Sequence, residues 1–366
     1  MRVLQLTKRS VTLFAALSLA LTACGGSDPD APFNPAGTSE DVQAVNATFA
    51  SPAFASFASF SPYFDLALEP APLVSSSTKV FNFRRATNAG ELRAAAVRNA
   101  KRVAALTPKL ANGSFNAATA AIPAEVAGKT FEFSGDSYAP GDRTGAPANG
   151  VRFLLYAVNP ITFAPLMPLQ EVGYVQLTDL SGSSSQAARV VVVSEGTTYI
   201  DYTVTATATV TGGRVTVAGY VTDGTNRANV NLRSTVTEAT GLTLVYTLDV
   251  PQRDVSIDLT MTMTGLDVQT FNIDIDLGMS GPNGTVSMSG QMTDTGGTLD
   301  VRVNGDLFAT ITSTGAAEPV ITGADGQPLT DEDATALENI FGITDSAFTS
   351  FDEMLVPVGA FMEPAA

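Results

Sequence analysis

Residues 242–264 read LTLVYTLDV-PQRD-VSIDLTMTMT. In both halves, large apolar side chains alternate with Thr, Ser and Asp, and a period of two is typical of a strand with one buried face. Proline and three polar residues at 251–254 separate the halves as a turn would. The stretch therefore predicts an antiparallel hairpin in which Leu248 faces Ile257, Leu244 faces Met261, and all four side chains point to one side.

The same pattern continues in both directions from this hairpin. Alternating segments are separated by Gly, Pro, Asn and Asp, which are typical of tight turns. Strands are expected at 130–134, 151–157, 172–180, 187–193, 198–211, 214–222, 227–236, 242–250, 255–264, 270–280, 285–293, 298–303 and 307–312. We therefore predict a mainly β fold. Residues 130–313 form a large antiparallel up-and-down meander, curved into a barrel or half-barrel, with helices at the N- and C-terminal ends.

The turns also predict how neighbouring strands pair. If Gly212-Gly213 is a two-residue hairpin loop, Ala208 faces Val217. Each further pairing keeps apolar side chains together, and a slip of one residue would send them to the opposite face. The expected pairs are Val204–Val221, Val221–Ala228, Val217–Leu232, Leu232–Tyr246, Met261–Ile273, Ile257–Leu277, Leu277–Met288, Met292–Leu299 and Val301–Ala309. At the last turn, a three-residue loop Asn304-Gly305-Asp306 with a left-handed Gly305 keeps the pattern in phase.

The nine strands from 198 to 312 would form a sheet about 43 Å wide, at ~4.8 Å per strand, with one apolar face. Residues 330–362 predict two helices that pack on this face, the first capped by Thr330 and the second stopped by Pro357. Helices of ~10 Å diameter cover only part of that width, which leaves room for a cavity. The expected cavity-lining residues are Val204, Ala208, Val217, Gly219, Leu232, Leu244, Tyr246, Ile257, Met261, Ile273, Leu277 and Met288.

Residues 42–129 are expected to be helical or irregular. The three-residue steps Phe54-Phe57-Phe60 predict a short helix with one aromatic edge. Apolar residues at helical spacing between 92 and 106, with Arg98 and Lys101 opposite, predict a basic amphipathic helix. This helix either complements the acidic remainder of its domain or contacts anionic lipid headgroups.

Composition excludes several classes of function. The chain of 366 residues has no histidine and one cysteine, which excludes Ser-His-Asp and Cys-His catalysis and imidazole-ligated zinc or haem. No convergent catalytic set is evident, so we expect neither an enzyme nor a cofactor. The net charge of −16 repels phosphate backbones, which argues against nucleic-acid binding.

Three aspartates are candidates for a cation site. The predicted pairing places Asp258 opposite Asp276, with Asp274 on the same polar face. Like charges that face each other destabilise a strand pair, and a cation such as calcium would relieve the repulsion. No ligand-rich loop accompanies the three side chains, so no metal site is predicted.

The N-terminus is predicted to carry an export signal. Arg2, Lys8 and Arg9 are followed by an apolar run at 11–20 that is too short to span a bilayer. The next residues, Leu21-Thr22-Ala23-Cys24, resemble the bacterial lipobox. The resemblance implies a signal peptide at 1–23, cleavage before Cys24, and a fatty acyl group such as palmitate as the covalent lipid on that cysteine. Residues 24–41 are small, polar and proline-rich, and are predicted to form a flexible tether.

These features predict a lipoprotein of the bacterial cell envelope, bound to a membrane through its anchor. Gly25 differs from the aspartate that retains lipoproteins at the inner membrane in some bacteria, which favours the outer membrane. The predicted architecture is similar to that of envelope lipid carriers and lipoprotein chaperones, whose curved sheets enclose an apolar cavity. The similarity implies a lipid or another apolar small molecule as ligand.

Two alternatives stay open. The first is a structural or protein-interaction lipoprotein with a solid core and no ligand. The second is a transmembrane barrel, which would show the same alternation, although the strands lack aromatic girdles at their ends. The sequence does not predict the oligomeric state.

Overall fold

The computed structural model describes residues 34–49, 56–57, 97, 100–101, 103, 120–135, 137–159, 164–209, 212–237, 241–265, 271–314, 319–335, 337, 354–355, 357–359 and 361. The predicted signal peptide, Cys24 and residues 25–33 of the predicted tether lie outside these ranges. Phe54 and Phe60 of the predicted aromatic helix lie outside them as well.

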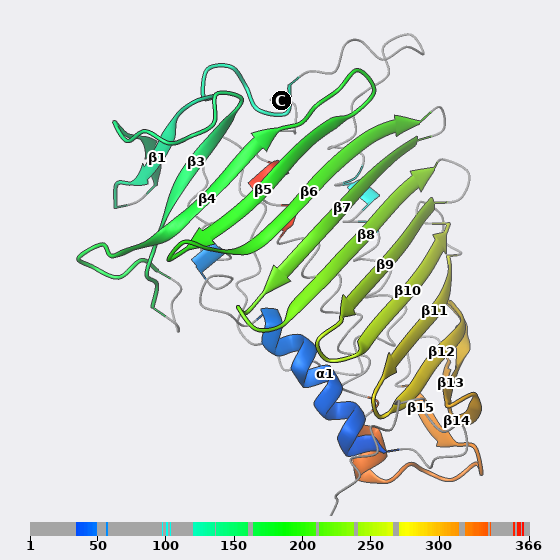
Figure 1. Cartoon of the computed structure of the whole chain (residues 1–366). Coiled ribbons are helices and arrows are strands. Elements are labelled where there is room, and N and C mark those ends of the chain that lie inside the picture. The colour runs from blue at the N-terminus through cyan, green and yellow to red at the C-terminus, as the bar shows by residue number, and fades with distance from the viewer. Residues whose placement is uncertain are drawn as a thin grey trace, which may run out of the picture.

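The described part of the chain is dominated by one sheet of fifteen strands (Figure 1). The strands are β1 (Thr130–Phe133), β2 (Tyr138–Pro140), β3 (Gly150–Tyr156), β4 (Glu171–Asp179), β5 (Gln186–Ser194), β6 (Thr197–Thr209), β7 (Gly212–Thr222), β8 (Arg227–Thr237), β9 (Gly241–Val250), β10 (Val255–Thr264), β11 (Asn272–Gly281), β12 (Gly284–Thr293), β13 (Gly296–Val303), β14 (Asp306–Ser313) and β15 (Val320–Gly323). Every predicted strand is present.

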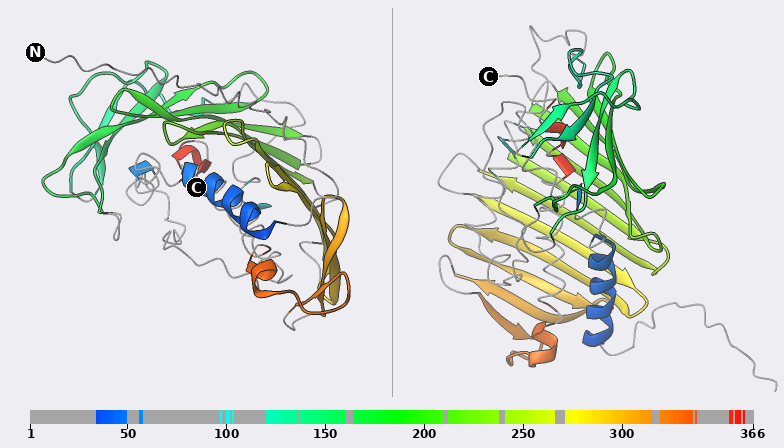
Figure 2. Two further views of the ribbon diagram at one scale, coloured as in Figure 1. Left: turned by 60° about the horizontal axis from the view of Figure 1, so that its bottom comes forward. Right: turned by 90° about the vertical axis from the view of Figure 1, so that its left-hand side faces the viewer.

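From β3 to β15 each strand pairs antiparallel with the next, which confirms the up-and-down meander. At the other end β1 pairs with β3 in parallel, and β2 forms the edge. The edge strands β2 and β15 do not pair with each other, so the described sheet is open. Figure 2 shows it curved like a trough, with the described helical segments on the concave side.

Five of the eight turns have the predicted pairing. The hairpin of β9 and β10 places Leu248 opposite Ile257 and Leu244 opposite Met261. Four other strand pairs agree with the prediction, through Val221–Ala228 and Val217–Leu232, Leu232–Tyr246, Leu277–Met288, and Val301–Ala309.

Three predicted pairings are wrong, each by an even number of residues. Across β6 and β7, Val204 faces Val217 rather than Val221. Gly212 and Gly213 belong to β7 and pair with Thr209 and Ala208, so they are not the loop. With the predicted loop Ile200 would have faced residue 225, beyond the end of β7. The observed pairing places it opposite Val221 and lengthens the ladder.

The other two shifts are of two residues. Met261 faces Ile275 rather than Ile273, and Leu277 faces Leu259 rather than Ile257. Met292 faces Gly297, while Leu299 faces Gly290. A shift of two residues keeps every side chain on its face, so the apolar alternation could not detect it.

The turn between β13 and β14 has two residues rather than the predicted three. Val303 pairs with Asp306, and Asn304 and Gly305 have φ values of 50° and 95°, the left-handed conformation that a two-residue hairpin turn requires. A bulge opposite Val301 and Arg302 then restores the phase. The predicted left-handed Gly305 is correct.

Helix α1 (Pro35–Phe49) overlaps the predicted tether, so residues 35–41 are helical and that part of the prediction is wrong. Asn34 caps the helix, because its side-chain oxygen accepts a hydrogen bond from the Gly37 N–H at 3.0 Å. Pro35 occupies the first helical position, where a missing N–H costs nothing. Thr38, Val42, Val45 and Thr48 lie at helical spacing and are buried, so the helix packs along one side.

The N-terminus of α1 docks on the turn between β11 and β12. The Asn34 amide donates to the Asn283 side chain at 3.2 Å, and the Asn283 amide donates to Asp41 at 3.0 Å. A Cβ on Gly37 would clash with the Asn283 side chain. The absence of a side chain at position 37 therefore allows this close approach.

The C-terminal prediction is partly correct. Thr330 accepts a hydrogen bond from the Asp333 N–H at 3.2 Å and so caps a helix at residue 331. Residues 357–359 and 361 are helical like residues 354–355, so Pro357 does not stop the second helix. Met354, Leu355, Val358 and Phe361 all join the core on the concave face.

Two short strands were missed, β2 and β15. With three and four residues respectively, neither holds enough alternation to predict a strand. Near β2 the sheet is also buried on its second face, where Phe133, Leu154 and Tyr156 form a small cluster with Tyr138. The Tyr138 hydroxyl donates to the Leu154 carbonyl at 2.7 Å, and this bond holds the edge strand against β3.

Candidate functional site

The predicted interior face is the concave face of the sheet. Eleven of the twelve predicted lining residues are buried there. They are Val204, Ala208, Val217, Leu232, Leu244, Tyr246, Ile257, Met261, Ile273, Leu277 and Met288. Gly219 is only half-buried. Apart from Ala208, the eleven belong to one continuous cluster with Val42 and Val45 of α1.

The two inward glycines do not mark open space. A Cβ at Gly219 would lie on the backbone of Asp201 and Tyr202 in β6, and one at Gly290 would strike the Thr298 carbonyl in β13. Both glycines therefore permit close approach of a neighbouring strand. A side chain at position 219 would have no space, so this glycine gives no support to the expected cavity.

The N- and C-terminal segments meet the concave face around Tyr202 of β6. The Tyr202 hydroxyl donates to the Met354 carbonyl at 2.8 Å, and the Phe57 ring packs edge-on against the Tyr202 ring at 6.5 Å. The two segments are separated by about 300 residues, yet both contact this one side chain. Burial raises the pKa of Tyr202 well above its ordinary value, so the hydroxyl stays protonated and remains a donor.

Tyr246 of β9 is the second tyrosine inside the trough. It lies between Leu232 on β8 and Leu259 on β10 and is 3% exposed. Burial raises the pKa of Tyr246 as well. Unlike Tyr202, its hydroxyl makes no hydrogen bond within the described part of the chain. Tyr246 therefore brings a polar atom without a hydrogen bond into otherwise apolar packing.

The basic amphipathic helix is confirmed where it is described. Residues 97, 100–101 and 103 are helical, Lys101 is exposed, and Val103 is fully buried in the main core cluster. The helix therefore turns its apolar side to the interior and its lysine to solvent.

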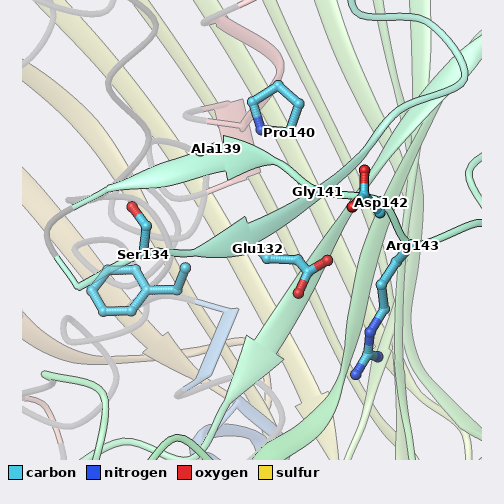
Figure 3. Close-up of a pocket in the computed structure, with 8 residues that line it drawn as sticks. Glu132, Ser134, Ala139, Pro140, Gly141, Asp142 and Arg143 are labelled. Atoms are coloured by element: carbon cyan, nitrogen blue, oxygen red, sulfur yellow. The ribbon is translucent and has the colours of Figure 1, made fainter.

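A pocket of about 510 Å³ lies away from the concave face, at the edge formed by β1 and β2 (Figure 3). Its lining includes Glu132, Ser134, Asp142 and Arg143. Arg143 forms an ion pair with Glu171 at 2.7 Å, so its charge is already compensated. Glu132 lies against Gly141, where a Cβ would clash with the carboxylate. The pocket is broadly open, and sequence analysis missed it because it missed β2.

The aspartates weighed as cation ligands do not come together. Asp258 faces Gly278, and Asp276 faces Thr260, so the two-residue shift in pairing separates the carboxylates that were predicted to oppose each other. Asp274 accepts hydrogen bonds from Asn272 and Gln291. Within the described residues, no group of His, Cys, Asp and Glu side chains could hold a metal ion.

Comparison with protein families, with curated proteins and with solved structures finds no match to this chain. Among the helical residues that the structure describes, none belongs to a helix long and apolar enough to cross a membrane. The interpretation of function therefore depends on the residues and the geometry alone.

Proposed function

We propose that this protein is a lipid-anchored lipoprotein of the bacterial cell envelope that binds one amphiphilic molecule between its curved sheet and its terminal segments. The ligand class is a lipid or fatty acid with an apolar chain and a polar end. The protein is not an enzyme in this proposal. The anchor is the acylated Cys24, and the outer membrane is its favoured location.

The observation that carries the proposal is the hydroxyl of Tyr246, a side chain that is 3% exposed and makes no hydrogen bond within the described residues. Phenylalanine at this position would fill nearly the same volume and would not carry a polar atom into the apolar face. A ligand whose polar end reached the hydroxyl would satisfy it, while its chain would contact leucine and methionine side chains of β8 to β11. One hydrogen bond and a large apolar contact area are typical of a site that orients an apolar ligand.

The alternative, a structural or protein-interaction lipoprotein with a solid core, is favoured by Gly219 and Gly290, because neither glycine leaves open space. The two proposals differ in what an enlarged interior side chain would do. Ala206 is fully buried on β6 and faces Val215. The variant Ala206→Phe therefore distinguishes a solid core from a ligand-binding interior.

Ligand binding is tested by titrating the purified full chain with an environment-sensitive dye and displacing the dye with a long-chain fatty acid. We expect saturation at about one molecule per chain, and native mass spectrometry should detect co-purified lipid. No binding of either probe, together with strong destabilisation by Ala206→Phe, would replace the carrier proposal with the solid-core alternative.

The anchor is tested separately. Cys24→Ser should abolish incorporation of labelled fatty acid, since the chain has no other cysteine. Continued labelling of this variant would overturn the anchor, whatever the result of the ligand titration.

A further inference from the structure

The chain between β3 and β4 carries the most exposed large apolar side chain of the described residues. Met167 is 73% exposed and the adjacent Leu166 is 40% exposed. Pro168, which follows them, is also exposed. No charged residue occurs between Tyr156 and Glu171, although the whole chain carries a net charge of −16. An uncharged, exposed apolar segment in so acidic a chain points to an interaction surface.

Backbone hydrogen bonds give this segment a defined base. The Ala157 N–H donates to the Gln170 carbonyl, and the Leu166 N–H donates back to the Ala157 carbonyl, each at 2.8 Å. Val158 and Pro165 then form an isolated antiparallel bridge. We call residues 157–159 and 164–170 the apolar hairpin. Figure 1 shows it at the left, beyond the ends of β3 and β4.

The apolar hairpin projects further than its neighbours. In an up-and-down meander, alternate turns lie on the same rim of the sheet. The hairpin shares its rim with the turns β5–β6, β7–β8, β9–β10, β11–β12 and β13–β14, which have only two to four residues each. Leu307, 37% exposed, also lies on this rim, beside the β13–β14 turn.

The N-terminal end of the described chain lies at the same rim. Asn34 hydrogen-bonds to Asn283 in the β11–β12 turn, and Cys24 lies only ten positions before Asn34. A chain of that length spans at most about 36 Å. A lipid on Cys24 is therefore confined near the rim that carries the apolar hairpin.

We infer that this rim faces the lipid bilayer, and that Leu166 and Met167 of the apolar hairpin enter its interfacial layer. The inference rests on the proposed acylation of Cys24, which keeps the protein at the membrane and raises the local concentration of the hairpin there. The acyl chain and the hairpin are then two contacts on one rim, and together they fix the orientation of the sheet relative to the membrane.

The absence of tryptophan from the chain allows a direct test. Met167→Trp and Leu180→Trp are made in the full-length lipidated protein, which is reconstituted in vesicles of phosphatidylethanolamine and phosphatidylglycerol. Leu180 is the matched control, because it is 50% exposed but lies in the β4–β5 connection on the opposite rim. Vesicle flotation of the unsubstituted protein is measured first.

We expect tryptophan at position 167 to show blue-shifted emission and strong quenching by brominated lipid, while tryptophan at 180 keeps the emission of a water-exposed indole. Equal quenching at the two positions overturns the orientation. If the protein floats with vesicles but position 167 stays water-exposed, the rim inference is wrong and the anchor stands. If the protein does not float at all, the anchor and the rim inference fail together.

Discussion

Tyr202 and Tyr246 occupy comparable positions in two parts of the concave face and differ in what their hydroxyls contact. Both are almost completely buried, one on β6 and one on β9. Tyr202 donates to the Met354 carbonyl and packs against Phe57, so it marks where the terminal segments close on the sheet. The Tyr246 hydroxyl meets no such partner in the described chain. The Tyr202 hydroxyl on β6 therefore finds its hydrogen-bond acceptor within the protein. The Tyr246 hydroxyl on β9 has no acceptor in the described chain.

The comparison depends first on which side chains of β9 point to the concave face. A charge placed at one of these buried positions should have the largest effect on stability. Leu244 is fully buried on β9, two residues before Tyr246, whereas Thr243 faces Thr235 and Thr262 on the polar side. Leu244→Asp should lower the free energy of unfolding by about 4 kcal/mol or more, since it buries an unpaired charge. Thr243→Asp should change it by less than about 1 kcal/mol. Similar losses in urea denaturation would contradict the assignment of faces.

A change that disturbs the packing of β6 against β7 should have the second largest effect on stability. Gly219→Ala should destabilise by roughly 2–3 kcal/mol, because a Cβ there meets the backbone of β6. A Cβ added at Gly278 on β11 would instead lie in open space. Gly278→Ala should therefore be neutral or stabilise by up to about 1 kcal/mol. Thermal unfolding of the two variants compares them directly. If Gly219→Ala does not lower stability, the concave face near β7 has space for a ligand.

The two tyrosines themselves should respond differently to loss of the hydroxyl. Tyr202→Phe leaves the buried Met354 carbonyl without its donor and should cost about 1–2 kcal/mol in the ligand-free protein. Tyr246→Phe removes a donor that has no partner, so stability should stay unchanged or rise slightly. Chemical denaturation of both variants measures this. An equal loss in the two would show that Tyr246 is satisfied by the chain.

For ligand affinity the order of the two variants should be reversed, so that Tyr246→Phe has the larger effect. This effect is the smallest of those predicted here. Tyr246→Phe should weaken binding of a long-chain fatty acid about five- to tenfold, which corresponds to one hydrogen bond. Tyr202→Phe should leave the affinity within about twofold. Calorimetric titration distinguishes the two. If the fatty acid binds both variants as tightly as the unsubstituted protein, its polar end does not contact Tyr246.

Much of this fold could be predicted because alternation of apolar and polar residues decides which face a side chain occupies. Leu232, Leu244 and Ile257 were placed correctly for that reason. Alternation cannot decide between pairings that differ by two residues, and all three errors in pairing were of this even kind. The observed pairing of β10 with β11 avoids placing Asp258 directly opposite Asp276, and a hydrophobic pattern contains no information on such repulsion between like charges.

The candidate site was harder to predict than the fold. The sequence placed Tyr246 inside but could not distinguish it from Tyr202, because the difference lies in where Met354 and Phe57 come to rest. Helix α1 was missed in part because its first residues, Pro35 and Gly37, are typical of linkers. Pro35 occupies the first helical position after the cap residue Asn34, and Gly37 allows Asn283 to approach the helix. Both roles depend on contacts that the sequence does not reveal.

The contact between Asn34 and Asn283 also has a consequence for the order of folding. The two residues are 249 positions apart, and closing a flexible loop of that length costs roughly 5 kcal/mol in chain entropy. The two side-chain hydrogen bonds to Asn283 cannot offset this cost by themselves. Each hairpin of the meander, by contrast, closes over a few residues and can form as the chain emerges. Helix α1 is therefore expected to emerge early during synthesis but to dock late, after β11 and β12 have formed. Its docking at Asn283 then reports that the β11–β12 hairpin has formed.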